Sequence, residues 1–141
     1  MSILISIDPG RYKCGLILAN IKTRQVLLAN IIEVSYLHDI ISTWKEEFHV
    51  EIILIGNGTS SNYCANILKK IAPIKLVDEI GSTLESRYRY WELSPPPLWI
   101  SWIPRGLLFP PDNLDAVAAL VILEKHLGKK LEWLGPYIFK I

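Results

Sequence analysis

The chain has 141 residues, half of them apolar and 21% charged, with a formal net charge of +1. This is the length and composition of one ordinary globular domain, which excludes a disordered chain, and the near-neutral charge confines any phosphate-binding surface to a local patch. No cationic leader opens the chain and no run of about 18 uncharged apolar residues occurs, so we expect a cytoplasmic protein.

The first third of the chain predicts β-structure. Three apolar runs, residues 3–7, 15–19 and 25–34, are separated by turn-forming residues. The second connection has the length of a hairpin turn, which favours an antiparallel meander. Gly15 is a candidate position for a bulge.

The middle of the chain alternates helix and strand. The predicted elements are a helix over 36–48, a strand over 51–56, a helix over 59–71, a strand over 74–79 and a helix from Ser82 through Trp91. Thr59 or Ser60 is the expected N-cap of the second helix, and Ser82 with Glu85 fits a capping box.

Residues 93–111 form an apolar segment with six prolines and two tryptophans, too many breakers for regular structure. It is expected either to fold back over the core or to form a partner surface, and a homodimer through this segment is one expectation. A final helix follows over 112–127, with Asp112 as the expected N-cap and Gly128 as the expected C-terminal stop.

These elements together predict an α/β fold in a single domain, residues 1–141. Three antiparallel strands followed by two parallel strands give a five-stranded mixed sheet flanked by helices. Cys14 and Cys64 lack the paired spacing of zinc or disulfide sites and are expected to be buried, reduced thiols. The three histidines are expected on the surface.

Four carboxylates lie at the ends of the predicted elements. Asp8 ends the first strand, Glu79 ends the fifth, and Asp112 and Asp115 open the last helix on the same side of its first turn. If the first and fifth strands are parallel, their ends share the sheet edge at which ligands usually bind.

Carboxylates that meet at one edge repel each other, by about 3 kcal/mol for two charges about 5 Å apart at an effective dielectric constant near 20. A dication offsets this repulsion. Since His and Cys are absent from the group, oxygen ligands favour Mg²⁺ or Mn²⁺ over Zn²⁺. Two such ions can hydrolyse a phosphodiester.

Each acid also has a structural alternative. Asp112 can act as a helix cap alone, Asp115 can interact with the helix dipole, and Asp8 can be an Asx-type turn residue before Pro-Gly. Glu79 can form a salt bridge with Arg87 or Arg89, with the neighbouring Asp78 directed inward in its place.

Four segments carry a family resemblance: "ISIDPGRYKCGLILAN", "LIGNGTS", "VDEIGSTLESRYRYW" and "DNLDAVAALVILEKHL". In this order they resemble the YqgF/RuvX-like proteins of the ribonuclease H-like superfamily. The proline-rich stretch followed by "PRGLLFPPDNLDAVAAL" resembles the variant common in cyanobacteria. The resemblance implies a ribonuclease H-like fold and divalent-metal hydrolysis of structured nucleic acid. The family has been described both as Holliday-junction resolvases and as nucleases of small-subunit ribosomal RNA precursors.

The resemblance also implies roles for the acids. Asp8, Glu79 and Asp115 match the family's metal ligands, and Asp112 matches an extra acid of the related RuvC resolvases. One departure is that Ile80-Gly81 stands where the family commonly has a cation.

Several other residues are candidates for binding nucleic acid. Arg11 and Lys13 could neutralise phosphates or simply form a solvated hairpin tip. A loop at 57–59 and the helix start at 82–83 could bind phosphate through backbone N–H groups. The residues so identified are Arg11, Lys13, Asn57, Thr59, Ser82, Thr83 and Arg87. The rings of Tyr88 and Trp91, which share a helix face with Leu84, are expected in the core.

Two other classes of function compete with a nuclease. One is a non-catalytic module that keeps the fold and binds nucleic acid or protein, which the missing cation and the near-neutral charge favour. The other is a relative of actin-like sugar kinases, but those enzymes place ATP between two such domains, and this chain has the length of one.

Overall fold

The computed structural model describes residues 2–78, 82–108, 114–133 and 139–140. Within these ranges it is an α/β structure built on one sheet, in the order β5-β4-β1-β2-β3-β6. The strands are β1 (Ile3–Asp8), β2 (Lys13–Asn20), β3 (Gln25–Glu33), β4 (Ile52–Asn57), β5 (Ile74–Asp78) and β6 (Phe139–Lys140).

The pairing of the strands confirms the predicted five-stranded mixed sheet. β1, β2 and β3 are antiparallel neighbours, β4 runs parallel to β1, and β5 runs parallel to β4. The two-residue strand β6 pairs parallel to β3 at the sheet edge and was not predicted, because two residues leave no periodic pattern in a sequence.

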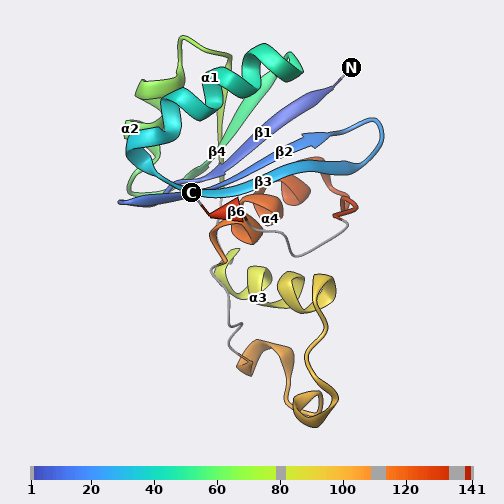
Figure 1. Ribbon diagram of the computed structural model, residues 1–141. Coiled ribbons are helices and arrows are strands. Elements are labelled where there is room, and N and C mark those ends of the chain that lie inside the picture. Colours follow the sequence, from blue (N-terminus) through green and yellow to red (C-terminus); the bar gives the residue numbers. More distant parts are fainter. Residues whose placement is uncertain (1, 79–81, 109–113, 134–138, 141) are drawn as a thin grey trace.

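Helices cover both faces of this sheet (Figure 1). The helices are α1 (Leu37–Phe48), α2 (Ser61–Leu68), α3 (Ser82–Leu93) and α4 (Asp115–Leu127), with short 3₁₀ turns η1 (Val34–Tyr36), η2 (Leu98–Ile100) and η3 (Arg105–Leu107). The first two helices lie on one face, α4 lies on the other, and α3 lies beyond α4.

The core is divided by the sheet into two apolar layers. On one side, Leu37 and Ile41 of α1 and Leu68 of α2 pack with the strand residues Ile5 and Ile7. On the other side, the small side chains of α4 let this helix lie close to the sheet. The buried residues of this second layer include Leu4, Ile17, Ala19, Leu54, Ala116, Ala119, Leu120 and Leu123.

The position of α4 on the sheet is fixed by one polar contact. The fully buried Ser6 of β1 donates a hydrogen bond from its Oγ to the carbonyl oxygen of Ala119, at 2.6 Å. A buried hydroxyl without a partner would lower the stability of the fold, so this bond favours the one position of α4 along β1 in which it can form.

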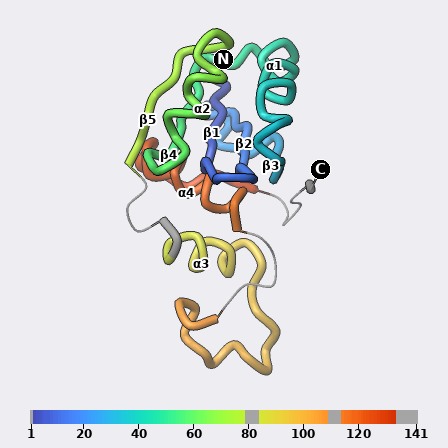
Figure 2. The backbone as a smooth tube through the Cα atoms, turned by 90° about the vertical axis from the view of Figure 1, so that its left-hand side faces the viewer, coloured from blue at the N-terminus to red at the C-terminus, as the bar shows by residue number. Residues whose placement is uncertain are grey.

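Beyond α4, the helix α3 and the Pro/Trp-rich segment form a separate lobe (Figure 2). Tyr90 and Trp91 are buried against Val117 and Leu108, while Trp99 and Trp102 are 77% and 79% exposed. Over residues 94–108, the described part that follows α3, the segment is irregular apart from the 3₁₀ turns η2 and η3, as predicted. It therefore folds back in part and exposes apolar side chains in part.

One prediction about helix ends needs correction, and two are confirmed. Helix α4 begins at Asp115 with Leu114 at the N-cap position, so the helix starts later than predicted, and Asp112, the predicted cap, lies outside the described residues. At α2 the N-cap is Ser60, one of the two predicted residues, although its side chain makes no capping bond. The hydroxyl of Ser61 donates to the carbonyl of Gly58 at 2.7 Å instead. Gly128 ends α4 in the left-handed region, with φ of 71°, as predicted.

Two further predictions, one about a β-bulge and one about burial on α3, were also wrong. The irregularity in the β2–β3 pairing lies at Leu18/Ala19 and not at Gly15. Leu84 and Tyr88 are about half exposed, although Trp91 of the same face is buried. The predictions for cysteine and histidine are confirmed, since Cys14 and Cys64 are buried free thiols and His38, His49 and His126 are exposed.

Candidate functional site

The carboxyl ends of three parallel strands meet at one edge of the sheet. Ile7 of β1 pairs with Ile55 of β4, and Asn57 pairs with Asp78 of β5. Asp8, Asn57 and Asp78 therefore close neighbouring strands at the same edge, which is where open α/β sheets bind ligands.

Helix α4 brings a second predicted acid to Asp8. Asp8 pairs with Gly15 across the β1–β2 ladder, and a Cβ atom at Gly15 would lie only 1.8 Å from the carbonyl oxygen of Asp115. The helix can approach this closely because residue 15 has no side chain. Asp8 and Asp115, which are far apart in the sequence, are thus both beside Gly15.

The electrostatics of Cys14, which precedes Gly15 in β2, agree with this placement. The hydrogen bond with Cys64 lowers the pKa of Cys14, burial opposes this, and the negative charge of Asp115 also raises it. The same hydrogen bond, together with burial, raises the pKa of Cys64.

The other two predicted acids, Glu79 and Asp112, lie outside the described residues. Over 2–78, 82–108, 114–133 and 139–140, no three His, Cys, Asp or Glu side chains form a group that could hold a metal ion. The pair that the structure does place, Asp8 and Asp115, offers only oxygen donors, and this chemistry fits a hard cation such as Mg²⁺ or Mn²⁺.

Arg11, on the turn that follows Asp8, and Lys13, the first residue of β2, are both exposed. A hollow of about 560 Å³ lies between this turn and the β4–α2 loop, and it is lined by Pro9, Gly10, Arg11, Thr59 and Ser60. Two candidates for phosphate binding, Arg11 and Thr59, thus line the same hollow next to Asp8. Asn57 is exposed at the end of β4, where its Oδ1 accepts a hydrogen bond from Ser61 Oγ at 3.4 Å.

The candidates on α3 lie elsewhere or outside the described part. The guanidinium of Arg87 donates to the carbonyl of Gly106 at 3.3 Å, which ties α3 to η3. Ser82 begins α3, but its side chain and that of Thr83 are outside the described part. Arg89 forms a salt bridge with Glu124, while Glu79, for which it was considered as a partner, lies outside the described residues.

The sequence analysis missed two exposed tyrosines near the predicted site. Tyr12 lies between the two cations of the first turn, and Tyr63 lies on α2. Neither tyrosine belongs to a recognisable motif in the sequence, and only the fold brings the two to one hollow.

Comparison with solved structures supports the fold. The chain resembles Thermus thermophilus RuvC in complex with a Holliday junction substrate, with a TM-score of 0.55, 14% identity and coverage of 92% of this chain and 98% of that chain. It also resembles a second Thermus thermophilus RuvC structure, with a TM-score of 0.56, 14% identity and coverage of 89% and 92%. The fold is therefore ribonuclease H-like.

Protein-family models gave no match to this chain. Curated proteins gave no match either. Among the described helices, none has both the length and the apolar character needed to cross a membrane.

Proposed function

We propose that this protein is a divalent-metal-dependent nuclease that hydrolyses phosphodiester bonds in structured nucleic acid. The observation that carries the proposal is the contact at Gly15, which puts Asp115 of α4 beside Asp8 at the ligand-binding edge of a ribonuclease H-like sheet. Asp8, Glu79 and Asp115 are the proposed metal ligands, with Asp112 as an additional acid.

Mg²⁺ or Mn²⁺ ions, two in the proposal, would lower the pKa of a bound water and stabilise the leaving oxygen. The protein's own part is to hold the acids and the substrate in position. Arg11, on the turn after Asp8, and Lys13, at the start of β2, would bind backbone phosphates on either side of the scissile bond. Asn57 and Thr59 would add neutral hydrogen bonds from the neighbouring loop.

The proposal is tested by a cleavage assay on the full chain. A four-way DNA junction and a precursor of small-subunit ribosomal RNA are incubated with Mg²⁺, with Mn²⁺ and with EDTA. We expect metal-dependent cleavage of one of them. Asp8→Asn, Glu79→Gln and Asp115→Asn should each lower the cleavage rate by more than about 100-fold. A loss of about 100-fold is the largest expected for a residue that only hydrogen-bonds to a metal ligand.

Asp39→Asn is the matched control, because Asp39 is an exposed aspartate on α1, in the first turn of that helix. It should cleave at the wild-type rate. A wild-type protein that cleaves neither substrate, or an Asp8→Asn variant as active as wild type, would contradict the nuclease.

The assay also decides between the two activities described for the resembled family. We infer a YqgF/RuvX-like protein from the four sequence segments, while the similar solved structure is RuvC with a Holliday junction. Cleavage of the junction alone supports a role in DNA recombination, and cleavage of the RNA alone supports ribosomal RNA processing.

A non-catalytic binding module is the second candidate. It is favoured by Ile80-Gly81 in place of the family's cation and by the net charge of +1. Calorimetric titration separates the two, because a module binds RNA or DNA without binding Mn²⁺, whereas the nuclease binds both.

We also propose that the Pro/Trp-rich segment mediates a homodimer. Leu98, Trp99, Trp102 and Leu107 are each at least 70% exposed, and a near-neutral chain has little charge repulsion to oppose contact between two copies. Light scattering should give a dimer for wild type and a monomer for the variant Trp99→Ala/Trp102→Ala. A wild-type monomer ends this proposal.

A further inference from the structure

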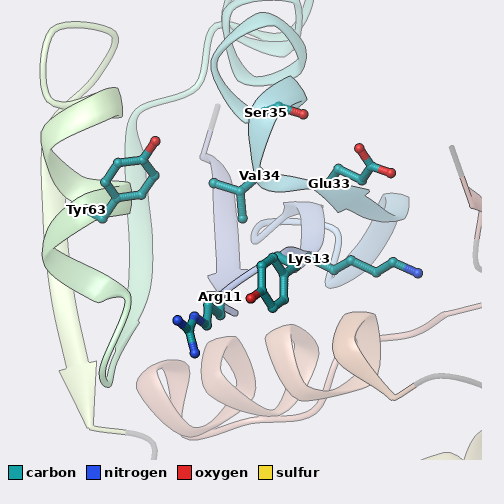
Figure 3. A pocket seen from close by; sticks show the side chains of 7 residues that line it. Arg11, Lys13, Glu33, Val34, Ser35 and Tyr63 are labelled. Carbon is teal, nitrogen blue, oxygen red and sulfur yellow. The ribbon is translucent and has the colours of Figure 1, made fainter.

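A second hollow, of about 550 Å³, lies between the β1–β2 turn, the start of η1 and helix α2 (Figure 3). The residues that line it are Arg11, Tyr12, Lys13, Glu33, Val34, Ser35 and Tyr63. Its volume is within the range of sites that hold small organic molecules.

Two exposed aromatic rings from different elements border this hollow. Tyr12 is 72% exposed on the turn, and Tyr63 is 62% exposed on α2. Figure 3 shows Tyr63 on one side of the hollow and Val34 on the other. Exposed aromatic rings beside an apolar side chain can stack on the flat face of a nucleobase, whatever the base.

The charges around the hollow favour an anion. Arg11 and Lys13 contribute two positive charges, and Glu33, which pairs with Lys13 across the β2–β3 ladder, contributes one negative charge. The guanidinium carbon of Arg11 lies 5.5 Å from the centroid of the Tyr12 ring. This cation–π contact places a phosphate-binding group beside a stacking surface.

The walls of the hollow are held together by buried contacts. The backbone N–H of Val34 donates to the carbonyl of Tyr12 at 2.8 Å, which joins the turn to η1. Cys14 and Cys64 follow Lys13 and Tyr63 in the sequence, and both are buried in one core cluster. A site that is already formed loses less entropy when a ligand binds.

The two hollows are adjacent. Arg11 lines both of them, and the first begins at Pro9, directly after Asp8. A nucleic-acid strand whose scissile phosphate lies at Asp8 can therefore continue past Arg11 into the second hollow, within a few nucleotides.

We propose that the second hollow binds one unpaired nucleotide of the substrate strand, with its base stacked on Tyr12 and Tyr63 and its phosphate on Arg11. Lys13, whose side chain extends in the other direction (Figure 3), would bind a neighbouring phosphate of the same strand. This inference rests on the proposed action on nucleic acid and adds that the strand next to the scissile bond is single-stranded. A duplex keeps its bases stacked inside and offers phosphates alone, so it cannot use the two rings.

The test measures binding of the full chain in EDTA, where no cleavage interferes. Fluorescence anisotropy gives the Kd for labelled oligo-dT, oligo-U and a blunt duplex. We expect Tyr12→Ala and Tyr63→Ala to weaken binding of single strands by about 10-fold each, and to leave duplex binding nearly unchanged. Tyr12→Phe and Tyr63→Phe keep the ring and should bind as wild type does.

Tyr36→Ala is the matched control, because Tyr36 is a half-exposed tyrosine on η1 that does not line the hollow. It should not change the Kd. Arg11→Ala and Lys13→Ala should each reduce the slope of log K against log salt by about 1.

The inference is overturned if wild type binds no single strand, or if Tyr12→Ala/Tyr63→Ala binds single strands as tightly as Tyr36→Ala does. This failure differs from failure of the nuclease. If the wild type cleaves its substrate but the tyrosine variants bind single strands as tightly as the wild type, only the stacking site is excluded. If single-strand binding depends on the two rings but no substrate is cleaved, only the nuclease is excluded.

Discussion

Gly15 is the residue on which the meeting of β2 and α4 depends. Any side chain there would overlap the backbone of Asp115, since a Cβ atom would lie 1.8 Å from its carbonyl oxygen and 2.6 Å from the backbone nitrogen of Ala116. Backbone atoms of a helix cannot move aside as the end of a flexible side chain can. The helix itself would have to shift, and Asp115 would move with it.

We therefore expect Gly15→Ala to lower the free energy of unfolding by about 3 kcal/mol, the upper end for overpacking, and to weaken Mn²⁺ binding as well. Gly128→Ala is the control. Gly128 has φ of 71° with open space around it, so alanine there costs only about 1 kcal/mol of backbone strain. Urea unfolding measures both, and equal losses in the two variants would contradict the close approach at Gly15.

His126 in the last turn of α4 gives a prediction about pH. Partial burial, followed by the positive charge of Lys75, lowers the pKa of His126 from its ordinary value of 6.5. The unfolded chain therefore takes up this proton at a higher pH than the folded chain, so its contribution to stability is present above about pH 6.5 and is lost as the pH falls through the folded value.

The measurement is an NMR titration of His126. Its pKa should lie below 6.5 in wild type and should rise in Lys75→Gln, while Lys22→Gln, which changes an exposed lysine of the β2–β3 turn, should leave it unchanged. An unchanged pKa in Lys75→Gln would show that burial alone is responsible.

At the scale of elements, one buried ion pair joins α3, α4 and the segment after α4. Arg89 Nε and Nη2 donate to the two carboxylate oxygens of Glu124, each at 2.9 Å. Nη2 also donates to the carbonyl of Leu131 at 2.8 Å, and the N–H of Leu131 donates back to Glu124 at 2.7 Å. The two side chains are only 11% and 9% exposed.

Removing one partner of this pair leaves a charge buried without compensation. We expect Arg89→Ala to lower the free energy of unfolding by about 3 kcal/mol. Lys130→Ala breaks the pair of Lys130 with Glu92, whose side chains are 65% and 46% exposed, and should cost less than about 1 kcal/mol. Similar losses for the two variants in urea unfolding would mean that the Arg89–Glu124 pair is solvated.

The periodic apolar residues and the Pro and Gly residues between them predicted which helices and strands form. They predicted the ends of these elements, and the side-chain pairs between them, less well. The strands and helices were found because their apolar residues repeat with regular periods. The start of α4 was placed at Asp112 because capping signals are local, whereas the helix begins where it can first pack on the sheet, at Asp115. The Arg89–Glu124 pair was missed because its partners are 35 residues apart in the sequence.

At the scale of the whole molecule, the fold explains why scattered acids can act together. Parallel strands put Asp8 and Asp78 at one edge, and the approach allowed by Gly15 adds Asp115. The sequence predicted Asp8 and Asp115 from their positions at element ends and from a family resemblance. It could not predict the hollow between Tyr12 and Tyr63, because that hollow exists only after α2 has packed beside the first turn.

The most direct test of the central claim, that these acids share a cation, is Mn²⁺ binding followed by calorimetry without any nucleic acid. The wild-type chain and Asp39→Asn should bind Mn²⁺ alike, and Asp8→Asn and Asp115→Asn should each lose affinity by more than about 100-fold while remaining folded by circular dichroism. Equal Mn²⁺ affinity in the wild type, Asp8→Asn and Asp115→Asn would contradict the account.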